Sequence, residues 1–258
     1  MENKRAARLL RGILCLAFWL AVWYVLALAV NRVLVLPTPA AVAKTLWGLL
    51  RTGAFYADCL WSLGRIFAGL LAGIAAGILL AAACAASSVL DALFSPVVSM
   101  VKATPVASVI ILMLYVLGKG AVPMIAAMLM VLPIVFAGVR RGIDAVPAEQ
   151  REVAKVYGFG LGKRLRCCIL PSVLPYFSAA CRSALGLAWK AGIAAEVICM
   201  PKNSIGSNLY DAKIYLESEE LYAWTIVVIL LSVLIEKGVV FALNRFAKKG
   251  GVADADAA

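Results

Sequence analysis

The chain has 258 residues, of which 64% are hydrophobic and only 15% are charged, and its mean hydropathy is +0.96. Soluble domains are far less apolar, so this composition indicates an integral membrane protein with no room for a separate soluble domain. We attribute the net charge of +11 to loops that flank a membrane, because no basic folded region is available to hold a nucleic acid.

Six hydrophobic segments are long enough to cross a bilayer, which predicts an all-α polytopic membrane protein. The predicted spans cover about 12–31, 66–90, 97–117, 121–139, 173–199 and 223–243. The first span follows a basic segment, a pattern also found in signal peptides. Its length and the lack of a small-residue cleavage site favour a span. The third span is expected to bend around Pro105.

Shorter features lie between these spans. Residues 40–50 are predicted to form an amphipathic helix at the outer surface. Residues 91–96 are predicted to form an inner turn, and residues 200–222 a polar loop. Gly69, Gly73 and Gly77 recur every four residues within the second span. Such a ridge of small residues lets another helix approach closely, from the same chain or from another one.

The longest polar run between hydrophobic segments covers residues 144–171 and contains eight charged side chains. Pro147 and Glu149 are start signals for a short helix, and Gly158 is a stop signal. Val153, Val156 and Tyr157 share one face of that helix. A second short basic helix is predicted to run to Leu170. Pro171 is predicted to end it.

Two interpretations of this hairpin are open from its residues. It is either a solvated loop whose positive charge orients the protein, or a surface at which another protein docks. Ala154 and Gly158 form a small-residue strip on which a second surface could approach closely.

The hairpin also resembles a family signature. Glu152-x-Ala154-x3-Gly158, followed after ten residues by Ile169-Leu170-Pro171, resembles the cytoplasmic EAA motif of ABC importer permeases. In that family this loop forms a coupling helix that docks on the ATPase. Val153 stands where the signature has its first alanine.

Further short matches follow in one order from Leu36 to Phe246 and are similar to the nitrate/sulfonate/taurine branch of this family. One match has a single aromatic residue, Tyr115, where the branch has a pair. The matching segments are Leu36-Pro37-Thr38-Pro39, Ser62-Leu63-x-Arg65, Lys102-x2-Pro105, Tyr115-x2-Gly118-x-Gly120, Ala188-Trp189, Ala194-Ala195-Glu196 and Gly206.

The resemblance implies the six-helix type I ABC importer permease fold and a single permease domain over residues 1–258. It also implies that 144–171 is the coupling loop, with Glu152, Ala154, Gly158, Ile169, Leu170 and Pro171 as coupling residues. The implied partners are two copies of an ATPase, a second permease copy, most simply in a homodimer, and a solute-binding protein. ATP and Mg²⁺ are then bound by the ATPase. The implied solutes are small and either anionic or heteroaromatic.

The distribution of charge gives a topology without the family. Four predicted spans precede the hairpin and two follow it, so the hairpin and both termini share one side. That side carries 17 of the 25 Lys and Arg residues, which places it in the cytoplasm. The resemblance implies that the membrane is a bacterial inner or plasma membrane.

No catalytic site is evident in the sequence. Gly158 to Arg164 superficially resembles a phosphate loop, but the spacing is wrong and no Ser or Thr follows Lys163. The chain has no histidine, and its seven cysteines form no C-x-x-C pair, so we expect no metal site and no enzyme activity.

Glu196, Lys190 and Trp189 in the fifth span are the candidate pathway residues. A charge near the middle of a bilayer costs about 2.5–3.5 kcal/mol, so it usually faces a cavity or a partner. Glu196 and Lys190 are six residues apart and do not share a helix face. Glu196 could equally be a structural contact to another helix. The alternative function is an ion-coupled secondary transporter or channel that uses Glu196 and Lys190.

Overall fold

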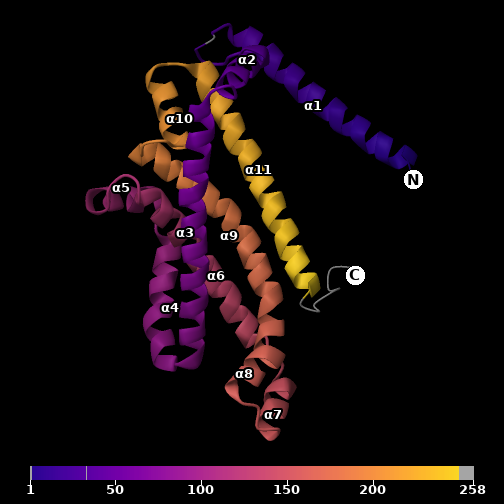
Figure 1. The fold of residues 1–258 in the computed structure, drawn as a ribbon, viewed down its shortest axis with the longest axis vertical. Coiled ribbons are helices and arrows are strands. Elements are labelled where there is room, and N and C mark those ends of the chain that lie inside the picture. The colour runs from indigo at the N-terminus through magenta and orange to yellow at the C-terminus, as the bar shows by residue number, and fades with distance from the viewer. Residues whose placement is uncertain (1, 33, 250–258) are drawn as a thin grey trace.

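The computed structural model describes residues 2–32 and 34–249, with side chains described for 11–32, 34–239 and 241. Every regular element in this part of the chain is helical, so the all-α prediction is confirmed. The long helices other than α1 form one elongated bundle (Figure 1). The α-helices are α1 Glu2–Val30, α2 Pro39–Leu49, α3 Gly53–Ala86, α4 Ser88–Ala103, α5 Val106–Val116, α6 Val122–Asp144, α7 Ala148–Val156, α8 Leu161–Arg164, α9 Leu170–Cys199, α10 Ile205–Ile214 and α11 Ser218–Lys249.

Five helical segments within the described residues are long and apolar enough to cross a membrane, and α4 with α5 forms a sixth span if the pair is counted as one. The two helices of that pair are bent by 104° at Thr104 and Pro105. A proline here lacks the backbone N–H that a continuous helix needs, which explains the break. The sequence predicted the bend but placed it in a single span over 97–117. It also predicted a turn over 91–96, which is wrong, because these residues lie inside α4.

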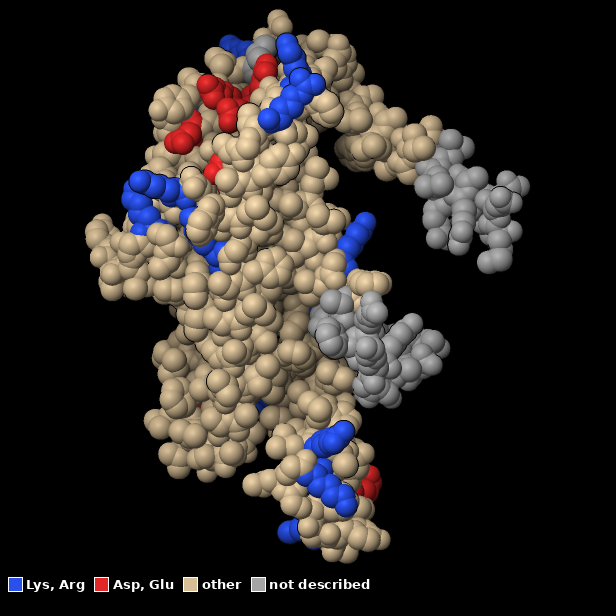
Figure 2. Space-filling model, viewed as in Figure 1, with Lys and Arg blue, Asp and Glu red and all other residues tan. Residues whose placement is uncertain are grey.

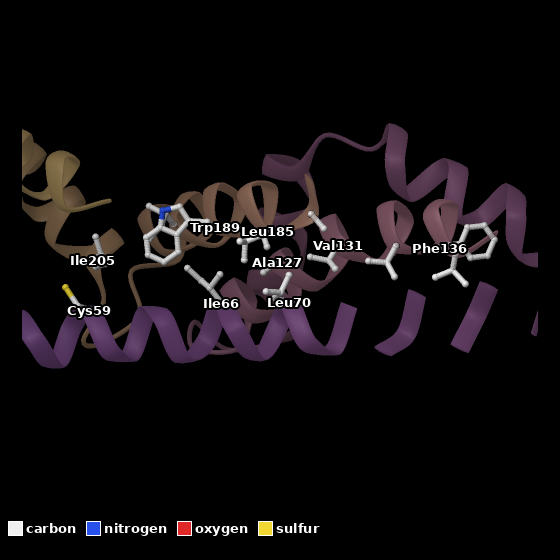
Figure 3. Close-up of a cluster of buried hydrophobic side chains, with 14 of the residues drawn as sticks. Cys59, Ile66, Leu70, Ala127, Val131, Phe136, Leu185, Trp189 and Ile205 are labelled. Atoms are coloured by element: carbon white, nitrogen blue, oxygen red, sulfur yellow. The ribbon is translucent and has the colours of Figure 1, made fainter. Parts of the chain in front are cut away.

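The centre of the bundle is formed by α3, α6 and α9. The glycine ridge of α3 faces α6 of the same chain, so close approach is achieved within one subunit. A Cβ atom added at Gly73 would lie 2.7 Å from Cβ of Val131 and 2.8 Å from the carbonyl oxygen of Met128. Leu185 and Trp189 of α9 point toward Ile66 of α3 in the same apolar core (Figure 3).

Helix α1 stands apart from this core. It leaves the bundle at the end where α2 lies and extends away from the other helices (Figure 1). Many of its large apolar side chains are exposed within this chain, and Phe18 and Trp19 are 61% and 63% exposed. Among its described side chains, those buried against the rest of the chain lie in its C-terminal half, where Ala27 is buried and Trp23 stacks on Tyr222 at 6.0 Å between ring centroids.

The second half of the hairpin joins the fifth span without a break. Helix α8 continues through a π-helical turn, Leu165–Ile169, directly into α9. The prediction that Pro171 ends a helix is therefore wrong. Pro171 lies in the first turn of α9, and the amide of Leu170 donates to the carbonyl of Leu165 in the wider π-type pattern. A π-turn at this point accommodates a residue that has no N–H to donate.

The polar segment after α9 is also more ordered than the sequence predicted. It contains α10, whose first turn is capped by Ser204. The Ser204 hydroxyl accepts a hydrogen bond of 3.1 Å from the amide of Ser207. Helix α9 ends at Met200, which adopts a left-handed conformation with φ of 48° and turns the chain back toward α10.

Candidate functional site

The hairpin of residues 144–171 projects from one end of the bundle (Figure 1). Figure 2 shows basic side chains gathered on it, below a broad surface of uncharged residues. The hairpin has a small core of its own, in which Ala154, Val146 and Cys168 are buried against Phe159 and Ile169. Two of the predicted coupling residues, Ala154 and Ile169, therefore hold the hairpin together.

Gly158 forms the turn that ends α7. Its φ is +61°, and no atom lies within 4 Å of the position that a Cβ would occupy. The Gly158 amide donates to the carbonyl of Lys155 at 3.2 Å, and the Phe159 amide donates to that of Ala154 at 2.9 Å. This pair of bonds is a Schellman motif, which requires a left-handed residue at this position. The glycine is thus explained by backbone conformation.

The outward face of α7 is apolar. Val153, Val156 and Tyr157 are 48%, 82% and 75% exposed, and Leu161 at the start of α8 is 81% exposed. These four residues are called the hairpin face below. Glu152 is also exposed. A patch of this kind at the polar end of a membrane protein is typical of a protein-binding surface. Leu170 and Pro171 are exposed nearby, at the base of the hairpin.

Polar contacts fix the hairpin to the bundle. The Arg151 guanidinium donates two bonds of 3.1 Å to the carbonyls of Ile143 and Asp144 at the end of α6. Arg140 of α6 pairs with Asp91 of α4 at 3.0 Å. The Arg151 bonds thus join the hairpin to α6, which Arg140 in turn joins to α4, and the continuous helix from α8 joins the hairpin to α9.

A second polar cluster lies at the opposite end of the bundle, around Glu196. Its side chain is fully buried and accepts a 2.7 Å bond from the Ser62 hydroxyl and a 3.2 Å bond from the Gly206 amide. Arg65 approaches at 3.4 Å. The same guanidinium donates to the carbonyls of Lys202 and Asn203 at 2.7 and 3.0 Å. Glu196 therefore joins α3, α9 and α10, which is the structural role that the sequence left open.

The sequence did not assign partners to Glu196. Ser62 and Arg65 are three residues apart and so lie on one face of α3, a signal that was present in the Ser62-Leu63-x-Arg65 match. Trp189 is also buried, and its indole N–H donates to the carbonyl of Val228 in α11 at 3.2 Å. Lys190 is exposed. The structure thus does not bring Lys190 and Glu196 together, as their spacing predicts.

No group of His, Cys, Asp and Glu side chains that could hold a metal ion occurs among the described residues. The cysteines whose positions are described are all free, and five of the seven are buried.

Comparison with known proteins identifies the family of this chain. The model of the family described as "Binding-protein-dependent transport system inner membrane component" matches residues 73–249. The chain belongs to this family. It is a membrane-spanning permease subunit of an ABC importer in the bacterial inner membrane, and the family that the sequence resemblance predicted is confirmed. Membership implies association with an ATPase and a solute-binding protein.

Three curated relatives are also named as permease proteins. The taurine transport system permease protein of Escherichia coli (strain K12) is 26% identical, over 86% of this chain and 83% of its own. The nitrate import permease protein of Synechococcus elongatus is 26% identical, over 82% and 79%. The riboflavin transport system permease protein of Chloroflexus aurantiacus is 33% identical, over 72% and 68%.

A solved structure described as "an amino acid ABC transporter with histidines" has the same fold. It matches with a TM-score of 0.60 at 17% identity and covers 76% of this chain and 94% of its own. The type I permease fold of this chain is thereby confirmed.

Proposed function

We propose that this permease imports a small solute and that the hairpin of residues 144–171 receives the work of ATP hydrolysis from a separate ATPase. The observation that carries this proposal is the hairpin face, Val153, Val156, Tyr157 and Leu161. It is apolar and exposed. Its first three residues belong to α7 and its C-cap, and Leu161 begins the helix that continues unbroken into the bundle. Burying such a face against a partner contributes about 25 cal/mol per Å².

The transmission follows from the rigidity of the connection. A displacement of α8 moves α9 with it, because the helix from Leu161 to Cys199 is continuous. The same displacement reaches α6 through Arg151 and α4 through the pair of Arg140 with Asp91. Such an arrangement suits a subunit whose helices rock between inward-facing and outward-facing states. ATP and Mg²⁺ then bind only in the ATPase.

The assembly that we propose contains two permease copies, two ATPase copies and one solute-binding protein at the outer end. The exposed apolar side chains of α1 support a second permease copy, because this helix contacts so little of its own chain. The basic residues of the hairpin support a cytoplasmic position for it and for both termini. The solute is nitrate-like, sulfonate-like or heteroaromatic, as the names of the relatives suggest.

The test is co-purification with the ATPase combined with uptake in proteoliposomes. The change Tyr157→Asp, combined with Val156→Asp, introduces charge into the hairpin face and should abolish retention of the ATPase. Lys155→Ala is the matched control, since Lys155 is exposed on the other side of α7, and it should retain the ATPase. Full retention and uptake by the double variant would overturn the proposal.

A further inference from the structure

From Ala179 to Ala194, the exposed side of α9 has a composition unlike that of a surface in contact with lipid. The exposed residues of this part recur at helical spacing and are small or cationic, with one leucine. Pro175 and Tyr176 are exposed nearer the hairpin. No carboxylate belongs to this stripe among the described residues. The members of the α9 stripe are Ala179, Arg182, Ser183, Leu187, Lys190 and Ala194.

Other helices show what a lipid-facing surface of this protein looks like. The exposed side of α3 carries Leu71 and Leu79, and that of α11 carries Ile229 and Leu230. These are large apolar side chains, as expected where acyl chains are the neighbours. The α9 stripe instead carries small and cationic side chains, although α9 is also long and apolar enough to cross the membrane.

Lys190 lies deep along this stripe. It precedes the end of α9 by nine residues, or about 13 Å, and follows its start by twenty residues, or about 30 Å. No ion pair of Lys190 occurs with any described residue. An ammonium group at this depth usually faces a water-filled cavity, because hydrocarbon cannot solvate it.

The candidate carboxylate of the same helix is not available to a solute. Glu196 is fully buried and holds Ser62, Arg65 and the Gly206 amide. Trp189 is turned into the contact with α11. Of the three pathway candidates that the sequence indicated, only Lys190 presents its charge on an open surface.

We propose that the α9 stripe lines the solute pathway and that Lys190 makes this pathway selective for solutes that carry an anionic group. This inference rests on the proposed function and selects between its two solute classes, in favour of the nitrate-like or sulfonate-like one. A fixed positive charge in a low-dielectric passage attracts an anion and repels a cation over several ångströms.

The test measures the electrostatic character of the stripe directly and needs no knowledge of the solute. The permease is assembled with its ATPase in proteoliposomes, and the exposed Cys15 and Cys167 are replaced by serine. Ala194→Cys then serves as a reporter, because residue 194 is exposed and lies one turn from Lys190 on the same face. The probes are an anionic ethylsulfonate and a cationic ethyltrimethylammonium methanethiosulfonate of similar size.

The anionic probe should react faster with the reporter. Adding Lys190→Gln should lower the ratio of the two rate constants by about tenfold. Lys190→Arg should keep the ratio, and Lys213→Gln on α10 is a control that should leave it unchanged. Leu230→Cys, on the apolar side of α11, should react with neither probe.

Two results would overturn the proposal. One is an absence of reaction at residue 194 with and without ATP, and the other is a ratio that Lys190→Gln does not change. ATP-driven uptake by the chain with native Lys190 is measured on the same preparation. If ATP-driven uptake is observed but the labelling ratio does not depend on Lys190, the role of Lys190 is refuted and the proposed function stands. If there is no ATP-driven uptake, the proposed function itself is refuted.

Discussion

The carboxylate of Glu196 accepts a 2.7 Å hydrogen bond from the hydroxyl of Ser62, a residue 134 positions earlier in the chain. The same hydroxyl accepts a 2.9 Å bond from the amide of Ile205. One buried pair of side chains thus fixes the end of α9, the first half of α3 and the start of α10.

The first prediction concerns this cluster. Glu196→Ala leaves the Ser62 hydroxyl and the Gly206 amide without their acceptor and removes one of the three acceptors of the Arg65 guanidinium. Because such groups are costly to leave unpaired in a buried site, the variant should lose about 3 kcal/mol or more of stability. Thermal unfolding of the purified complex in detergent measures this loss. Glu196→Gln should lose less, since its amide oxygen still accepts, and Asp211→Asn on the exposed side of α10 should lose nothing measurable.

The second prediction concerns the contact between α3 and α6. Gly73→Ala would place a methyl group 2.7 Å from Cβ of Val131, so the two helices would have to move apart. We expect a destabilisation of about 1–3 kcal/mol. Gly64→Ala is the control on the same helix, because nothing lies within 4 Å of its Cβ position. Equal melting temperatures for the two variants would contradict the packing described here.

The third prediction separates two explanations of Gly158. If the left-handed backbone is what this position requires, Gly158→Asn should keep nearly full uptake, since asparagine tolerates this conformation. Gly158→Val should fail, because a β-branched residue at a φ of +61° is strongly strained. Loss of uptake in the asparagine variant, with the ATPase still bound, would instead indicate that the glycine is in contact with the partner.

The fourth prediction concerns Glu152. Its side chain is exposed, so Glu152→Lys should leave the melting temperature unchanged within about 0.5 kcal/mol of stability. The same change should uncouple ATP hydrolysis from uptake if this carboxylate faces the ATPase. Glu149→Lys, one turn earlier on α7, tests whether the effect is specific to position 152. Full uptake by the Glu152 variant would count against its coupling role.

The sequence predicted those features that depend on local patterns. Hydrophobic length located the membrane segments, Pro105 located the break in the third span, and Gly158 located the end of α7. The position of α10 was missed, although Ser204 is a typical N-cap residue, because the polar composition around it suggested a loop.

What could not be predicted is set by tertiary structure. The 104° angle between α4 and α5 depends on the helices against which α5 packs, because Pro105 alone specifies only a break. The partners of Glu196 come from residues far apart in the chain. The burial of Ala154 within the hairpin likewise depends on Cys168, on the other arm of the hairpin. Helical spacing placed Val153, Val156 and Tyr157 on one face of α7, but it did not show whether that face is exposed or buried.

The central claim is that this permease moves solute only when an ATPase acts on its hairpin. The most direct measurement is solute uptake by proteoliposomes that contain the permease with its binding protein, with and without the ATPase. We expect accumulation against a gradient only when the ATPase and ATP are both present, and none when the hairpin face carries Val156→Asp with Tyr157→Asp. Accumulation against a gradient by the permease without any ATPase would contradict the account.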